Sequence, residues 1–409
     1  MVVLRWRARV FLPYVGACFF RGVTHRYAEL LCEPSPAVRV GLSKTLTLPV
    51  KGDYVTVDVN EQRVDLLLDS GFSDLSVVDG HWFEEKYVKG SCSERPSGCY
   101  FCPKEEPCSF GEDELVVRSR FGGGVVLESI IRSGVLTLDG QSVRNFTFRV
   151  SRYTVWDVEG WRPWGHFGIA ALPPQSPPFY HWPNRESVLG ALKRNDLIER
   201  LSYTVVAQRS HFTTRNSISG QLTLGDAPEE SEMANRTLNL ADDPVFNRSL
   251  APLLVSSVEV LGEGETVPLH IEGIYPRAIL TILDTGHNTV GLPFPGFEEA
   301  VLNAMTGGLR ADGYDAAEIA ALWWRDKQGF LWVRGQARAY LPVLRIRLGD
   351  ESKTVPIDLH PEHYCGKIVR GDVGVYVRYK AVSGLGTPLF KARAVHVDYS
   401  SHRMALLDN

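Results

Sequence analysis

The chain lacks long apolar runs and a strong excess of charge of either sign. No stretch of 18 apolar residues occurs among its 409 residues, so a conventional membrane-spanning helix is not expected. Lys and Arg total 44 against 48 Asp and Glu, a balance too even to indicate nucleic-acid binding. The 24 prolines and 37 glycines punctuate many short apolar runs, which favours an all-β protein with few short helices.

Residues 1–42 have the charge order of a signal peptide. Arg5, Arg7 and Arg9 precede an apolar run from Val10 to Phe20 that is too short to span a bilayer. Two alternatives stay open, an uncleaved N-terminal membrane anchor and a plain N-terminal extension. A signal peptide predicts a protein of the secretory pathway, working outside the cell or in a lysosome-like or vacuole-like compartment.

Cysteines are few outside one polar segment. Of the seven, Cys18 lies in the presumed signal peptide, while four are grouped with the spacing C-x6-C-x2-C-x5-C at Cys92, Cys99, Cys102 and Cys108. In an oxidising compartment such a group predicts disulfides that hold together a loop with little core of its own. A zinc site with four thiolate ligands is the rival interpretation, for which the single C-x2-C is weak support.

Glycosylation sequons add weight to the disulfide interpretation. They occur at Asn145, Asn235 and Asn247, as expected for a secreted glycoprotein. The sequence does not determine which cysteines pair, and a bond between Cys32 and Cys365 also remains open.

Two stretches in different halves of the chain echo each other. The first, Val64–Gly71, is an apolar run that ends in Asp69-Ser70-Gly71, and the second, Ala278–Gly286, ends in Asp284-Thr285-Gly286. A continuous apolar run predicts a buried strand, so each carboxylate is expected at the floor of a site. A buried Asp needs a hydrogen bond or a partner, which the hydroxyl residue can provide, and the Gly allows a sharp turn.

If the two turns face each other, Asp69 and Asp284 share one site. Two carboxyl groups that lie so close together do not both ionise easily, so one keeps its proton while the other is a base. Such a pair can activate water and protonate a leaving amine without a metal or a cofactor. The plainer alternative is two ordinary Asx turns that end strands.

The remaining pattern predicts mostly strands. Apolar segments at Leu115–Arg120 and Val125–Leu138 flank Phe121-Gly122-Gly123-Gly124 and predict a hairpin with a mobile tip. Strands are also expected at Tyr54–Val59, Tyr340–Leu348, Gly374–Tyr379 and Ala394–Leu407. Helices are expected at 186–193, 297–305 and 315–324.

Taken together, these motifs resemble the pepsin-like aspartic proteases. Asp69-Ser70-Gly71 and Asp284-Thr285-Gly286 resemble the two catalytic turns, and Phe121, Gly122 and Gly123 fall where that family has its flap. Gly168–Leu172 and Gly384–Gly386 fall where each lobe closes around its turn. The cysteine-rich segment is more loosely similar to the insert of nepenthesin-type members.

The resemblance implies a two-lobed acid-protease fold with an active-site cleft between the lobes. We expect an N-terminal lobe at 43–230, a crossover at 231–250 and a C-terminal lobe at 251–409. Asp69 and Asp284 would be catalytic, with Ser70 and Thr285 bracing the turns. The implied protein is a monomeric aspartic endopeptidase that acts on polypeptides and needs no metal or cofactor.

Several positions depart from the family pattern. Phe72 and His287 stand where a hydroxyl residue usually follows each turn and donates to the outer carboxylate oxygen. Phe72 cannot donate, which is expected to leave Asp69 short of one hydrogen bond, whereas His287 still can. Phe121 replaces the flap Tyr, and Ser76 replaces its Trp partner. A catalytically weakened or inactive pepsin-fold binding protein is therefore the alternative function.

Overall fold

A computed structural model describes most of the chain after Ser43. The described residues are 44–93, 98–111, 113–121, 125–155, 163–172, 186–209, 216–233, 235–243, 248–262, 266–269, 278–380 and 383–408. They belong to one compact unit, Ser43–Asn409. This unit is mostly β, with 44% strand and 19% helix, which confirms the expected fold class at that level. The predicted signal peptide or anchor at 1–42 lies outside the described residues.

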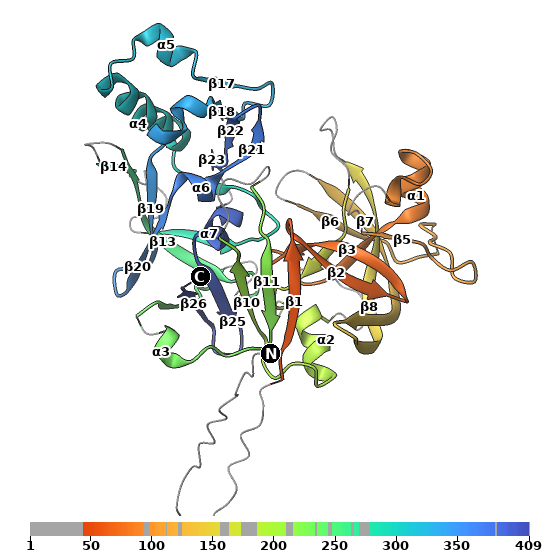
Figure 1. The fold of residues 1–409 in the computed structure, drawn as a ribbon. Coiled ribbons are helices and arrows are strands. Elements are labelled where there is room, and N and C mark those ends of the chain that lie inside the picture. Colours follow the sequence, from red (N-terminus) through yellow and green to blue (C-terminus); the bar gives the residue numbers. More distant parts are fainter. Residues whose placement is uncertain are drawn as a thin grey trace, which may run out of the picture. The chain divides into compact units, whose positions relative to one another are not determined.

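The first half contains a closed barrel (Figure 1). Its elements are β1 (Leu46–Lys51), β2 (Tyr54–Val59), β3 (Gln62–Asp69), β4 (Leu75–Asp79), α1 (Gly80–Lys86), the 3₁₀ turn η1 (Ser91–Ser93), β5 (Cys99–Tyr100), β6 (Val117–Arg120), β7 (Val126–Leu138), β8 (Gln141–Val155) and β9 (His166–Gly168). Strands β2, β3, β9, β4, β8 and β7 pair in that order, and a β7–β2 pairing closes the ring. The barrel is mixed, because its β3–β9 and β4–β8 pairs are parallel while its β9–β4 pair is antiparallel.

A second group of strands joins the two ends of the chain. The elements are α2 (Val188–Arg194), β10 (Ser202–Ala207), β11 (Gly220–Leu224), α3 (Glu230–Met233), β12 (Thr237–Asn239), β25 (Ala394–Asp398) and β26 (Arg403–Leu407). They extend from β1 in the order β11, β10, β25, β26, β12, so C-terminal strands lie beside N-terminal ones (Figure 1).

The second half contributes two more sheets. The larger contains β13 (Pro252–Leu261), β14 (Thr266–Leu269), β15 (Ile279–Leu283), β16 (Val290–Leu292), β19 (Val343–Gly349), β20 (Thr354–Leu359), β23 (Val377–Tyr379) and β24 (Gly384–Leu385). The smaller contains β17 (Trp323–Arg325), β18 (Leu331–Val333), β21 (Cys365–Val369) and β22 (Asp372–Val375). The helices are α4 (Phe297–Ala311), α5 (Ala316–Ala320), η3 (Gly335–Tyr340), α6 (Pro361–Tyr364) and α7 (Thr387–Ala392).

The two halves repeat one arrangement of four strands. In the first half β3–β9 is parallel, β9–β4 antiparallel and β4–β8 parallel. In the second half β15–β24, β24–β16 and β16–β23 follow the same sequence of directions. Each copy begins with the strand that leads into an Asp turn. The duplicated motif seen in the sequence is therefore part of a duplicated strand topology.

Local patterning explains the strands that were predicted well. Buried and less buried residues alternate along β2, as expected of a strand with one covered face. The final residues of β3, from Leu66 to Asp69, are all buried, in keeping with their continuous apolar run. The hairpin prediction is confirmed, because β6 pairs antiparallel with β7 and Phe121 N–H donates to Val125 O. Its glycines, Gly122 and Gly123, lie outside the described residues.

Some predicted elements are wrong in extent. The helix expected at 315–324 stops at Ala320, and Trp323 and Trp324 instead lie on β17, which pairs with β18. Trp324 stacks on Trp332 across that pair, a contact a helix would not allow. The strand expected from Tyr340 begins at Val343, because Pro342 has no N–H to donate to a ladder.

The single strand expected at 374–379 is also wrong, because the structure divides it. Its residues belong to β22, which ends at Val375, and β23, which begins at Val377. Tyr376 lies between them, and its N–H donates to Tyr364 O.

The cysteine segment forms two short-range disulfides. Cys92 pairs with Cys99 and Cys102 with Cys108, which confirms disulfide stapling and is consistent with an oxidising compartment. The zinc interpretation is wrong, since these bonds leave no thiolate in the segment to ligate a metal. Cys365 is a free, buried thiol, and its suggested partner Cys32 lies outside the described residues.

No helix within the described ranges is long and apolar enough to cross a membrane.

Candidate active site

The two Asp turns are held where their strands end against a parallel neighbour. Asp69 is the last residue of β3, is only 5% exposed and lies in register with Gly168 of β9. Asp284 directly follows β15, and its N–H donates to Leu385 O of β24. The run after each neighbour then closes on the turn: Ala170 N–H donates to Phe72 O, and Thr387 N–H donates to His287 O.

The glycines of these closing runs lie too close to the turns for any side chain. A Cβ on Gly168 would lie 2.5 Å from Phe72 O, and one on Gly386 would lie 2.0 Å from His287 O. Both runs were expected to close around the turns, and the structure places them there. Glycine is required at these two positions by close backbone approach.

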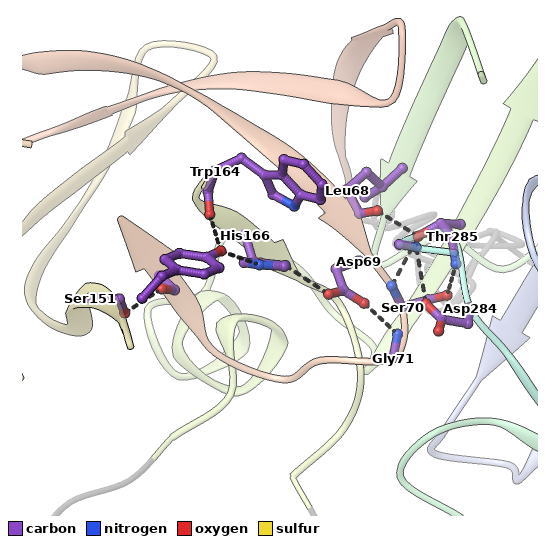
Figure 2. Close-up of polar contacts among 12 residues, drawn as sticks. Leu68, Asp69, Ser70, Gly71, Ser151, Trp164, His166, Asp284 and Thr285 are labelled. Atoms are coloured by element: carbon purple, nitrogen blue, oxygen red, sulfur yellow. Dashed lines mark hydrogen bonds and ion pairs between the residues drawn. The ribbon is translucent and has the colours of Figure 1, made fainter. Parts of the chain in front are cut away.

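The turns are joined by a symmetric set of crossed hydrogen bonds. Thr285 Oγ1 accepts from Ser70 N–H at 2.9 Å and donates to Leu68 O at 2.8 Å. In the reverse direction Ser70 Oγ accepts from Thr285 N–H at 2.9 Å and donates to Leu283 O at 2.9 Å (Figure 2). Each hydroxyl therefore satisfies one N–H and one C=O of the opposite strand. Ser70 and Thr285 brace the turns, as the sequence suggested.

This bracing brings the two carboxylates together. Gly71 N–H donates to Asp69 Oδ1 at 2.9 Å, and Gly286 N–H donates to Asp284 Oδ1 at 3.0 Å. A Cβ on Gly71 would lie 2.9 Å from Asp284 Oδ1, and one on Gly286 would lie 2.9 Å from Asp69 Oδ1. Each glycine thus lies against the carboxylate of the other turn, with no room for a larger residue.

The shared site gives the two carboxyl groups different protonation. Burial, and then the neighbouring charge of Asp69, raise the pKa of Asp284 from its ordinary value of 3.8 to about 8. Near neutral pH Asp284 therefore keeps its proton. A protonated acid beside a second, differently bonded carboxylate can perform general acid–base chemistry on a water molecule.

Neither a search against protein-family models nor a search of curated proteins finds a match for this chain. The function must therefore be inferred from the site.

His166 is the site residue that the sequence interpretation missed. Its Nδ1 lies 2.9 Å from Asp69 Oδ2, and its side chain points at that carboxylate (Figure 2). The parallel β3–β9 register pairs His166 with Leu67 and brings it beside Asp69, although 97 positions separate the two in the chain. The one available signal was its position two residues before Gly168, at the start of the run that closes on the first turn.

The expectation that Phe72 leaves Asp69 short of a hydrogen bond is wrong, because His166 occupies that oxygen. Phe72 instead packs against His166 and Phe121, with ring centroids 5.6 and 5.8 Å away. Phe121 stacks on His166 at 5.2 Å. Ser76 is buried in β4 opposite His166, and its hydroxyl is hydrogen-bonded to that of Ser151 at 2.8 Å.

His287 does not take the expected donor role toward Asp284. Its ring Nε2 lies 2.5 Å from Lys380 Nζ and 3.0 Å from Thr289 Oγ1. Burial, and then the Lys380 charge, lower the pKa of His287 to about 3, so the ring is neutral and accepts from the ammonium group. Lys380 also acts electrostatically on Asp284, where it favours the ionised form.

No group of three or more His, Cys, Asp or Glu is placed to hold a metal ion within the ranges that the structure describes. Two small cavities lie away from the dyad. One is lined by Ala171, Leu172, Glu186 and neighbours, and the other by Asp79, His81, Lys104 and Arg152 with both ends of the second disulfide. Neither contacts Asp69 or Asp284, so the substrate cleft remains a prediction.

Proposed function

We propose that the chain is an aspartic endopeptidase that hydrolyses peptide bonds with a water molecule activated between Asp69 and Asp284. The observation that carries the proposal is the crossed bracing of the two turns, in which Ser70 and Thr285 each bond the opposite strand. In two ordinary Asx turns each side chain would hydrogen-bond its own local backbone, and no hydrogen bonds between the turns would be expected. The proposal includes a pepsin-like, two-lobed fold, which the repeated four-strand arrangement supports.

The unequal surroundings of the carboxyl groups suggest their roles. Asp284, with its raised pKa, donates a hydrogen bond to the scissile carbonyl and protonates the developing oxyanion. Asp69 accepts a proton from the attacking water, and hydrogen bonds from Gly71 and His166 to its two oxygens hold the carboxylate in place for this role. The proton then passes to the leaving amine. No covalent intermediate forms.

The substrate is proposed to be an extended polypeptide that binds across the dyad beneath the β6–β7 hairpin. Phe121 at the end of β6 contributes an apolar surface there, and it has no hydroxyl to bond the substrate backbone. The disulfides and the two described sequons, at Asn145 and Asn235, support work in the secretory pathway.

The test is digestion of a peptide library at pH 3 to 8 by the purified chain, with and without pepstatin. Asp69→Asn and Asp284→Asn are each expected to lower kcat/KM by at least about 10³-fold, because each removes one partner of the acid–base pair. Asp74→Asn is not a suitable control, since that buried carboxylate is paired with Arg149. Asp350→Asn, at an exposed turn, is the matched control and should keep full activity. Turnover that survives either dyad substitution would refute the proposal.

A pepsin-fold binding protein without catalysis is the second candidate. The observation in its favour is the aromatic cluster of Phe72, Phe121 and His166, which puts apolar rings where the protease family has hydroxyl groups. It predicts that the chain binds peptides or pepstatin but cleaves no library member. Cleavage that is lost in both Asp→Asn variants would exclude it.

A further inference from the structure

A chain of hydrogen bonds runs from the first carboxylate into the barrel. His166, only 6% exposed, lies with Nδ1 at 2.9 Å from Asp69 Oδ2 and Nε2 at 3.2 Å from the hydroxyl of Tyr153. The Tyr153 hydroxyl donates to Trp164 O at 2.6 Å. Figure 2 shows this series of contacts leading away from the dyad. The imidazole is thus held at both nitrogens.

The proton count along this chain determines the state of the ring. Burial raises the pKa of Tyr153 far above its ordinary value, so its hydroxyl keeps one proton, which points at Trp164 O. The Tyr153 oxygen can therefore only accept from His166, which requires a proton on Nε2. An ionised Asp69 is acceptor-only, which requires a second proton on Nδ1. With Asp69 ionised, both contacts are satisfied together only when the ring is an imidazolium.

We propose that His166 is a positioning residue for the first turn: as an imidazolium fixed by Tyr153, it donates to Oδ2 of Asp69 and holds that carboxylate ionised and oriented for its role as base. The inference rests on the proposed function for its catalytic meaning, but the ion pair itself does not depend on it. His166 bonds Oδ2 of Asp69, whereas Oδ1 accepts from Gly71 N–H, so the ring acts through one oxygen of the base and is a positioning residue rather than a catalytic one.

Other groups around the ring neither replace nor oppose this contact. From β3 it meets Asp69, from β8 Tyr153, and from the turn and the hairpin the apolar rings of Phe72 and Phe121. Ser76 of β4, opposite in register, is neutral. Arg149, across the Phe72 ring, is paired with Asp74. In the second half, Asp284 lies against Gly71 of the first turn, and Lys380 contacts His287.

Two substitutions of nearly equal size separate donation from packing. In His166→Asn the amide can keep a donor near the Nδ1 position, but the side chain no longer titrates. In His166→Leu the volume is kept and the donor is lost. A hydrogen bond to a charged carboxylate is worth about one pH unit of titration, so in the Leu variant the acidic limb of the kcat/KM profile should rise by about one unit.

The accompanying changes in rate follow from the same loss. The Leu variant should lose about tenfold in kcat with little change in KM, because a misplaced base affects the chemical step. The Asn variant keeps a donor but not the positive charge, so its acidic limb and its kcat should lie between those of the wild type and those of the Leu variant. Ser76→Ala is the matched control, since it removes a buried hydroxyl opposite His166 that is hydrogen-bonded to Ser151, which in turn is hydrogen-bonded to Ser129. Equal profiles for the Asn and Leu variants would overturn the proposal.

A spectroscopic measurement tests the ion pair without catalysis. Imidazole ¹⁵N shifts, assigned by difference with His166→Asn, should show both ring nitrogens protonated while Asp69 is ionised. In Asp69→Asn the shifts should instead show one ring nitrogen without a proton, because the carboxylate that requires the second proton is gone. An unchanged spectrum would overturn the inference. If the chain cleaves nothing but the spectrum changes, the proposed function fails and the ion pair stands.

Discussion

Replacing Thr285 with Val tests whether the crossed hydrogen bonds hold the two halves together. The change keeps size and β-branching but removes Oγ1, which accepts from Ser70 N–H and donates to Leu68 O, both buried. Each of the two buried groups left unpaired costs ~1–3 kcal/mol, so Thr285→Val should lower the free energy of unfolding by about 2–6 kcal/mol. Activity should fall with it, because the second carboxylate is no longer fixed.

Thr281→Val is the matched control for this measurement. Thr281 lies on β15, the strand that leads into the second turn, is 1% exposed, and its hydroxyl has no hydrogen-bond partner among the described residues. Replacing that hydroxyl with a methyl group should leave stability unchanged or raise it slightly. Urea unfolding followed by far-ultraviolet circular dichroism gives both values. Equal losses in the two variants would mean that packing, not the crossed bonding, accounts for the effect.

Two further predictions concern protonation and close approach. Burial and the charge of Asp69 raise the pKa of Asp284 from 3.8 to about 8 in the folded chain. Between about pH 4 and about pH 8 the folded chain therefore holds a proton that the unfolded chain has released, so the free energy of unfolding falls as the pH rises through this range. Asp284→Asn should flatten that part of the stability profile in thermal melts, and an unchanged slope would contradict the raised pKa. Gly386→Ala places a Cβ 2.0 Å from His287 O, so we expect a loss of about 1–3 kcal/mol or more in urea unfolding. Gly307→Ala, where a Cβ meets nothing within 4 Å, is its control and should not be destabilising.

The sequence predicts the dyad well because its signal is local. An apolar run followed by Asp, a hydroxyl residue and Gly specifies a buried strand and a tight turn from adjacent residues alone. Its occurrence twice made a shared site the simplest interpretation. The structure adds that Ser70 and Thr285 bond across to the opposite strands, which repetition alone does not specify.

Features set by long-range pairing were not predictable in the same way. His166 reaches Asp69 only through the parallel register of β3 and β9, which no local pattern specifies. The contact between His287 and Lys380, 93 positions apart, depends on the parallel pairing of β16 with β23, which Lys380 directly follows. The strand at Trp323 was mistaken for a helix because its partner, β18, supplies the decisive cross-strand contacts.

The residues around the first turn that depart from the protease pattern pack together in a single cluster. Phe72 and Phe121 pack on the His166 ring, and a small residue, Ser76, lies opposite it in the sheet, where a larger side chain would compete for the same space. Apolar rings that exclude water strengthen the His166–Asp69 hydrogen bond, since that bond then lies in a medium of low dielectric. A hydroxyl at position 72 is consequently not needed to satisfy Asp69. The first turn keeps its donor by drawing it from His166 of β9.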